Sequence, residues 1–157
     1  MALTSKNSLP AWSLAYAPLI LWIGLIFVFS SAAASASQTS RIMEPILRFF
    51  FSSATGETIQ QIHFFIRKCA HFTEYALLAF WAVRAWTRSS YYAVAKYRYP
   101  LAILLVLIVA SLDEFNQSFE PSRTSTPWDV LLDCVGGSAM VLFLWALHMF
   151  TARRKPA

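Results

Sequence analysis

Four stretches of this chain are candidates for helices that cross a lipid bilayer, and they restrict the fold more than any other feature. Hydrophobic residues make up 57% of the chain and charged residues only 13%, whereas soluble domains carry about 25% charged residues. A membrane-spanning helix needs about 20 mostly apolar residues. We therefore predict one all-α domain, an integral membrane four-helix bundle. Its predicted spans are about residues 12–29, 64–83, 101–119 and 127–151.

The cations are distributed unevenly between the loops that these spans predict. One side has eight cations and no acid: Lys6, Arg84, Arg88, Lys96, Arg98, Arg153, Arg154 and Lys155. The other side has the remaining cations and all eight acids. Because cytoplasmic loops are enriched in Lys and Arg, we predict a multi-pass protein with both termini in the cytoplasm. The charge distribution favours membrane lipids as partners of this basic chain, and we predict no binding to nucleic acid.

The first apolar segment also has a second interpretation. Lys6, the apolar run and residues 31–37 resemble a secretory signal with an A-x-A-like cleavage site. The run of about 18 residues is longer than the usual apolar region of about 7–15 residues in such signals. Retention and cleavage of this segment both stay open.

The outer loop after the first span contains an apolar stretch, Ile42–Phe51, around Glu44 and Arg48. Such a stretch is typical of a short helix that lies in the interface of the outer leaflet. An apolar flap that packs on the bundle explains the same pattern equally well.

Ionisable residues interrupt the second and third spans, although charge inside a membrane is costly and usually functional. At a rise of about 1.5 Å per residue, Glu74 lies about 14 Å from Val83, near the middle of a hydrocarbon layer about 30 Å thick. His71 and Asp113 lie about 18 Å from the inner boundary. We therefore predict a polar cavity in the outer half of the membrane, open to the outside and closed toward the cytoplasm.

Helical spacing places these residues on common faces. At about 100° per residue, Lys68, His71 and Tyr75 share one arc, while Arg67 and Glu74 lie on the adjoining arc. The predicted ligand-binding residues are Lys68, His71, Glu74, Tyr75, Asp113, Glu114, Gln117, Arg123, Asp129 and Asp133.

Within this set we assign provisional roles. Lys68, His71 and Arg123 would donate to a polar or anionic head group, and the acids would hold these donors in place. In a catalytic alternative, His71 is a base with Glu74 or Asp113 as its partner. No Ser, Thr or Cys has the context of a nucleophile. A third interpretation is a structural ion-pair network that only locks the helices together.

Two acids at the start of the fourth span call for different interpretations. Thr126, Pro127 and Asp129 are close to a capping box, so Asp129 would mainly cap the helix. Asp133 lies one turn deeper, and we predict that it pairs with Lys68, Arg67 or Arg123.

We predict no metal and no cofactor. His71 and Glu74, three residues apart, offer two ligands on one helix face. With Asp113 or Glu114 opposite them they could hold a divalent ion, but no second histidine joins them. Cys69 and Cys134 have no zinc-type spacing.

The order of the polar residues resembles the VanZ-like family of small bacterial membrane proteins, named for a teicoplanin-resistance protein. One family motif is matched by Lys68-Cys-Ala-His71-Phe72-Thr-Glu74-Tyr75. A second is matched by Asp113, Glu114, Gln117, Pro121, Arg123 and Asp129. The resemblance covers most of residues 12–145. The chain departs from it at Asp133, where the family often has Asn, and at Met140, where it often has Gly, while Gly136 fits.

The resemblance implies a four-span protein of the bacterial cytoplasmic (inner) membrane, oriented toward the outside and linked to glycopeptide (teicoplanin) resistance. It points to a lipid-tailed or lipid-linked envelope molecule as partner. Our leading hypothesis is a protein that binds such an amphiphile. The alternative is an integral-membrane hydrolase or transferase acting on a lipid-linked envelope substrate, with His71 as base.

Overall fold

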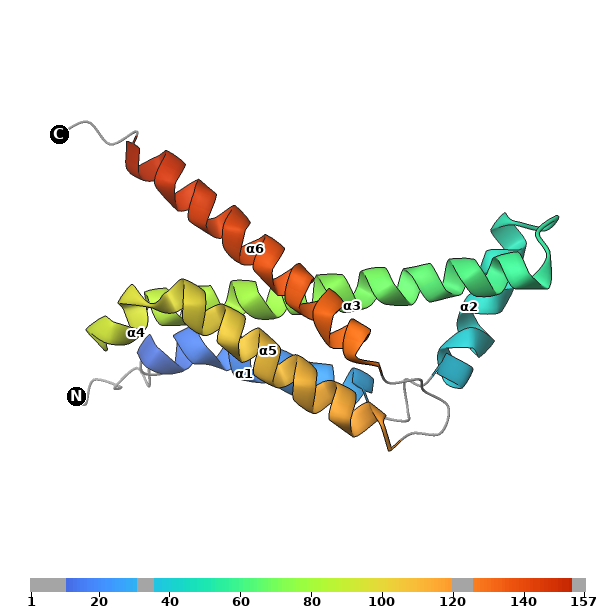
Figure 1. Cartoon of the computed structure of the whole chain (residues 1–157), viewed down its shortest axis with the longest axis horizontal. Coiled ribbons are helices and arrows are strands. Elements are labelled where there is room, and N and C mark those ends of the chain that lie inside the picture. Colours follow the sequence, from blue (N-terminus) through green and yellow to red (C-terminus); the bar gives the residue numbers. More distant parts are fainter. Residues whose placement is uncertain (1–10, 31–35, 120–125, 154–157) are drawn as a thin grey trace, which may run out of the picture.

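The computed structural model describes residues 11–30, 36–119 and 126–153, and all regular secondary structure there is helical, as predicted (Figure 1). The helices are α1 (Ala11–Ser30), α2 (Ala36–Phe50), α3 (Gly56–Thr87), α4 (Tyr92–Lys96), α5 (Arg98–Gln117) and α6 (Pro127–Arg153). Arg123 and most of the cleavage-like stretch at residues 31–37 lie outside the described residues.

Three of the described helices are long and apolar enough to cross a membrane. They contain Ser13–Ser30 of α1, Arg98–Gln117 of α5 and Pro127–Arg153 of α6, close to the first, third and fourth predicted spans. The polar residues of α3 lower its hydropathy, so α3 is not among them. Composition therefore supports three membrane-type helices, and it does not establish the full four-helix bundle.

Helix α3 extends well beyond the predicted second span, residues 64–83. Its 32 residues correspond to a length of about 48 Å. The helix starts early because the Thr55 hydroxyl accepts a hydrogen bond from the Thr58 N–H and so caps a helix terminus before the apolar stretch begins. The extra turns reach past the other long helices to α2 (Figure 1).

The fold is organised around α3, which contacts α1, α2, α4, α5 and α6. The start of α1 and the end of α6 lie at the end of the molecule that carries α4, opposite α2 (Figure 1). Helix α6 crosses α3 near its own start and then diverges from the other helices (Figure 1). The diverging half exposes Leu142, Phe143, Leu147 and Phe150, as expected of a surface that faces lipid.

The apolar core lies on the α4 side of the polar residues. Small side chains dominate it where α3 meets α5, including Ala79, Ala82, Ala102 and Ala110, all fully buried. Small residues let membrane helices approach closely. This end of the molecule is therefore tightly packed, in agreement with a cavity closed on one side.

A pair of glycines sets the position of α6. A Cβ atom at Gly136 would lie 3.1 Å from the Cα and the carbonyl carbon of Phe72 on α3, and one at Gly137 would lie 2.8 Å from both Cγ atoms of Val106 on α5. A side chain at either position would therefore force the neighbouring helix to move, so the two glycines allow α6 to pack closely against α3 and α5.

The apolar stretch of the outer loop is helical and belongs to α2. Leu47 is buried, whereas Ile42, Ile46, Phe49 and Phe50 are exposed. On the polar side, Arg48 and Glu44 form an ion pair at 2.8 Å. The helix contacts α3 and still presents an uncovered apolar face.

We predict that Gly136→Ala destabilises the protein, because the new methyl group would collide with the main chain of Phe72. Overpacking of this kind costs about 1–3 kcal/mol, and the midpoint of thermal unfolding in detergent should fall. Gly24→Ala on α1 is the matched control, since no atom lies within 4 Å of the position that its Cβ would take. Equal unfolding midpoints for the two variants would show that the α3–α6 crossing is not closely packed.

A buried polar cluster between α3, α5 and α6

Asp113 on α5 forms the centre of a buried hydrogen-bonded group. Its side chain is 1% exposed. The Tyr75 hydroxyl on α3 donates to Oδ2 of Asp113 at 3.0 Å, and Gln117 Nε2 donates to the same oxygen at 2.9 Å. The second contact comes from the i,i+4 spacing on α5, and the first joins α3 to α5. The other carboxylate oxygen, Oδ1, has no hydrogen-bond partner in the described part of the chain.

His71 on α3 faces Asp133 on α6. The distance from Nδ1 of His71 to Oδ1 of Asp133 is 3.7 Å, and Asp133 is fully buried. The close crossing at Gly136, one helical turn after Asp133, makes this approach possible. His71 therefore has acids of two other helices nearby, Asp133 on α6 and Asp113 on α5.

Lys68 pairs with Asp129, so the predicted pairing of Asp133 with Lys68 is wrong. The Thr126 hydroxyl also donates to Asp129 at 3.2 Å, and the Asp129 N–H donates to the Thr126 carbonyl oxygen at 2.9 Å. The Asp129 carboxylate thus contacts Thr126 at the helix start and forms an ion pair with α3, while its role in capping main-chain N–H groups stays a prediction. Asp129 and Asp133 lie four residues apart on one face of α6. The position of α6 along α3 therefore decides which acid meets Lys68, and it places Asp129 beside Lys68 and Asp133 beside His71.

A cavity of about 260 Å³ opens beside this cluster, between α1, α2, α3 and α5. Its polar lining comes from Arg67, His71, Glu74, Asp113, Ser30 and Thr39, and its apolar lining from Ile26, Phe29 and Ala70. Two of the lining groups, the Ser30 hydroxyl and Oδ1 of Asp113, are buried and lack hydrogen-bond partners among the described residues. The cavity therefore offers polar groups that a bound molecule could satisfy.

An apolar groove of about 440 Å³ adjoins the cavity along the outer surface of α1 and α3. The cavity and the groove share Phe29, Ala70 and Glu74. Trp22 lines the groove and donates from Nε1 to the Glu74 carbonyl oxygen at 3.0 Å, which joins α1 to α3. The cavity, which polar side chains line in part, thus adjoins an apolar surface groove.

The predicted site residues fall into distinct places. His71, Glu74 and Asp113 line the cavity. Tyr75, Gln117 and Asp133 lie behind them, Glu114 is buried on α5, and Lys68 and Asp129 form a separate pair. Arg123 lies outside the described residues. Their roles in ligand binding stay predictions.

Arg67 replaces Lys68 as the cation that lines the cavity. The sequence contained a signal for this position, because Arg67 lies seven residues before Glu74 and so shares its helix face. Ser30 and Thr39 had no such signal, since their place depends on how α1 and α2 pack against α3.

These features define a class: small helical proteins whose membrane-type helices enclose a polar cluster beside an open cavity. The VanZ/LLP1 family model matches residues 15–148, most of the chain. The chain therefore belongs to the VanZ/LLP1 family, which confirms the family expected from its motifs. Family membership and the three apolar helices fit a membrane location. No curated protein and no solved structure gives a significant match.

We predict that Tyr75→Phe lowers the stability of the folded protein. The change removes the Tyr75 donor to Asp113 and leaves the bond from Gln117 to the same oxygen. Loss of a hydrogen bond to a buried carboxylate costs about 1–3 kcal/mol. Thermal unfolding in detergent measures the effect, and Tyr92→Phe serves as control because Tyr92 is 79% exposed. A Tyr75→Phe protein as stable as the control would refute a structural contribution of this bond.

Proposed function

We propose that this protein spans the cytoplasmic membrane four times and binds an amphiphilic molecule of the cell envelope from the outer side. The observation that carries the proposal is the junction of the polar cavity with the apolar groove at Phe29, Ala70 and Glu74. An amphiphile needs both surfaces in one continuous site. A structural network alone would need neither.

The fourth span in this proposal is α3. Its length of about 48 Å exceeds the hydrocarbon thickness of about 30 Å, and α1, α5 and α6 surround it. The polar residues of α3 lower its hydropathy and make its insertion into the membrane costly. Two contacts reduce that cost: Tyr75 donates a hydrogen bond to Asp113, and His71 lies close to Asp133.

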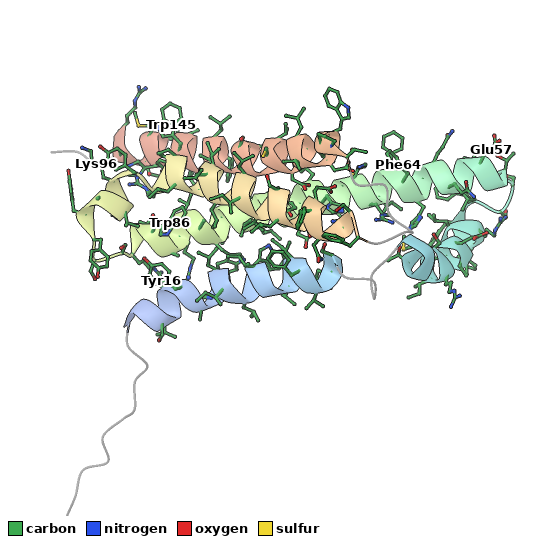
Figure 2. All side chains as sticks on the ribbon, turned by 60° about the horizontal axis from the view of Figure 1, so that its bottom comes forward. Tyr16, Glu57, Phe64, Trp86, Lys96 and Trp145 are labelled. Atoms are coloured by element: carbon green, nitrogen blue, oxygen red, sulfur yellow. The ribbon has the colours of Figure 1, made fainter. Side chains whose placement is uncertain are left out.

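The orientation rests on the two ends of the molecule. Tyr16, Trp86, Lys96 and Trp145 gather toward the end that carries α4, while Glu57 and Phe64 lie toward the other end (Figure 2). Aromatic residues favour the membrane interface, and cations favour the cytoplasmic side. We therefore place the α4 end and both termini in the cytoplasm, and the cavity in the outer half of the membrane.

Helix α2 completes the outer side of the proposed site. Its exposed apolar face, Ile42, Ile46, Phe49 and Phe50, would lie in the interface of the outer leaflet. Thr39 of α2 lines the cavity, so membrane contact and cavity entrance belong to one helix.

The size of the cavity restricts what enters it. Sites that enclose drug-sized molecules measure about 300–1,000 Å³, and this cavity measures about 260 Å³. A head group of modest size fits, whereas a whole glycopeptide does not. Lipid-tailed teicoplanin would therefore reach the site through its acyl tail in the α1–α3 groove, and a link to resistance would depend on that tail or on a competing envelope lipid.

We predict that Arg67→Ala weakens binding of envelope lipids, since hydrogen bonds to charged groups contribute about 1.5–3 kcal/mol and their loss corresponds to about tenfold or more in affinity. Native mass spectrometry of the purified protein with an envelope lipid extract measures the bound fraction. Arg88→Ala is the matched control, because Arg88 is exposed at the opposite end of α3.

A second variant tests the junction. Ala70→Phe should block passage between cavity and groove and abolish binding of both teicoplanin and lipids in the same assay. A glycopeptide without an acyl tail should bind no variant. Retention of lipids by Arg67→Ala and Ala70→Phe at the level of the control would refute the proposed site.

The catalytic alternative is supported by one observation, the approach of His71 to Asp133. A carboxylate next to a histidine orients the ring and stabilises its protonated form. Sequence reasoning assigned this partner role to Glu74 or Asp113, and the distance favours Asp133.

If the protein is a hydrolase or transferase, His71→Ala should abolish the formation of product from the lipid extract. Mass spectrometry measures the product. His148→Ala is the control, because His148 is exposed near the end of α6. Absence of any turnover by the unmodified protein with every lipid fraction would reject the catalytic alternative and leave the binding function in place.

A further inference from the structure

The most unusual side chain of the polar cluster is Asp133. It is 0% exposed, and neither carboxylate oxygen has a hydrogen-bond partner among the described residues. Buried carboxylates are normally paired, hydrogen-bonded or bound to a metal. Lys68, one of the three cations predicted to pair with it, is engaged by Asp129. The nearest charge partner of Asp133 is His71, at 3.7 Å.

Asp113 also has a carboxylate oxygen without a hydrogen-bond partner among the described residues, but only one of its two. Oδ2 accepts hydrogen bonds from Tyr75 and Gln117, while the buried Oδ1 has no partner in the described part of the chain. The two donors hold the carboxylate in place and leave one oxygen for a further ligand. In metal sites, hydrogen bonds from neighbouring side chains to a ligating carboxylate orient it toward the ion in the same way.

The donor atoms converge at one point between three helices. One atom each of His71 on α3, Asp113 on α5 and Asp133 on α6 lies within 4.8 Å of the others. Ligand atoms bound to a zinc ion at about 2.0–2.2 Å lie about 3–4 Å from one another. Small side-chain rotations would therefore bring these three atoms to the spacing that a bound ion requires. One imidazole and two carboxylates suit a divalent transition-metal ion.

We propose that His71, Asp113 and Asp133 bind a divalent transition-metal ion of the Zn²⁺ or Mn²⁺ class. The surroundings favour a cation, because Asp113, Glu114, Asp129 and Glu74 all act electrostatically on Asp133. This site goes beyond the proposed binding of an amphiphile and does not require it. From the sequence we predicted no metal, since that reasoning sought a second histidine and could not place Asp133 opposite His71.

The cavity gives the ion a route of entry and an open position. His71 and Asp113 line the cavity, and Asp133 lies behind them. A metal with three protein ligands keeps a further position for water or a ligand oxygen. That position would face the cavity, where an anionic head group is able to reach it.

Metal content and affinity of the detergent-purified full-length protein test the proposal. After treatment with a chelator and its removal, titration with Zn²⁺ and with Mn²⁺ should show saturable binding of at least one of them and a higher unfolding midpoint. Asp133→Asn and Asp113→Asn preserve side-chain size and should weaken binding by more than about tenfold. Gel filtration checks that each variant is folded and monodisperse.

Two controls separate this site from nonspecific binding. Glu57→Gln changes an exposed acid at the start of α3, and His148→Gln changes a histidine at the far end of α6. Both variants should bind the metal like the unmodified protein. Failure of both metals to bind, or equal binding by Asp133→Asn and Glu57→Gln, would overturn the proposal and indicate that the buried carboxyl groups are neutralised by protons. If the unmodified protein binds the metal but no lipid, the amphiphile site alone is refuted.

Discussion

The polar cluster depends on the close crossing of α6 over α3 at Gly136 and Phe72. Phe72 follows His71, and Asp133 precedes Gly136 by one turn, so the main-chain approach at the glycine brings the acid to the histidine. Association of helices in lipid relies on van der Waals packing more than on the hydrophobic effect. The small residue therefore creates the geometry, and the ionisable groups take advantage of it.

The second glycine extends this effect to α5. Gly137 packs against Val106, two turns before Asp113 on the same helix. The two neighbouring glycines fix α6 against both of its partners at once. As a result, residues from three separate parts of the chain meet at one depth, while the rest of α6 diverges (Figure 1).

Much of the architecture was predictable because apolar stretches of about 20 residues have few alternative structures. The three apolar spans are close to their predicted ranges, and the helical faces of α3 correctly placed Arg67 beside Glu74. The pairing across helices was not predictable. Asp129 and Asp133 share one face of α6, so the position of α6 along α3 decides which acid meets Lys68, and the contact between Gly136 and Phe72 fixes that position.

The length of α3 escaped prediction for a related reason. Apolarity marks the part of a helix that meets lipid, whereas Thr55 sets where the helix begins. The added turns from Gly56 onward are what bring α2 beside the cavity. A cap of a few residues therefore determines whether the cavity has an outer wall.

Charge balance connects the two proposals. The described cluster has five acids, Glu74, Asp113, Glu114, Asp129 and Asp133, against the two cations Arg67 and Lys68. Lys68 is already paired with Asp129, so an anionic head group would enter a cavity that the acids Glu74 and Asp113 line together with Arg67 and His71. Like charges repel strongly at low dielectric constant, which disfavours such a ligand on Arg67 alone. A divalent cation held by His71, Asp113 and Asp133 removes this difficulty, because it would neutralise the wall and attract the head group at the same time.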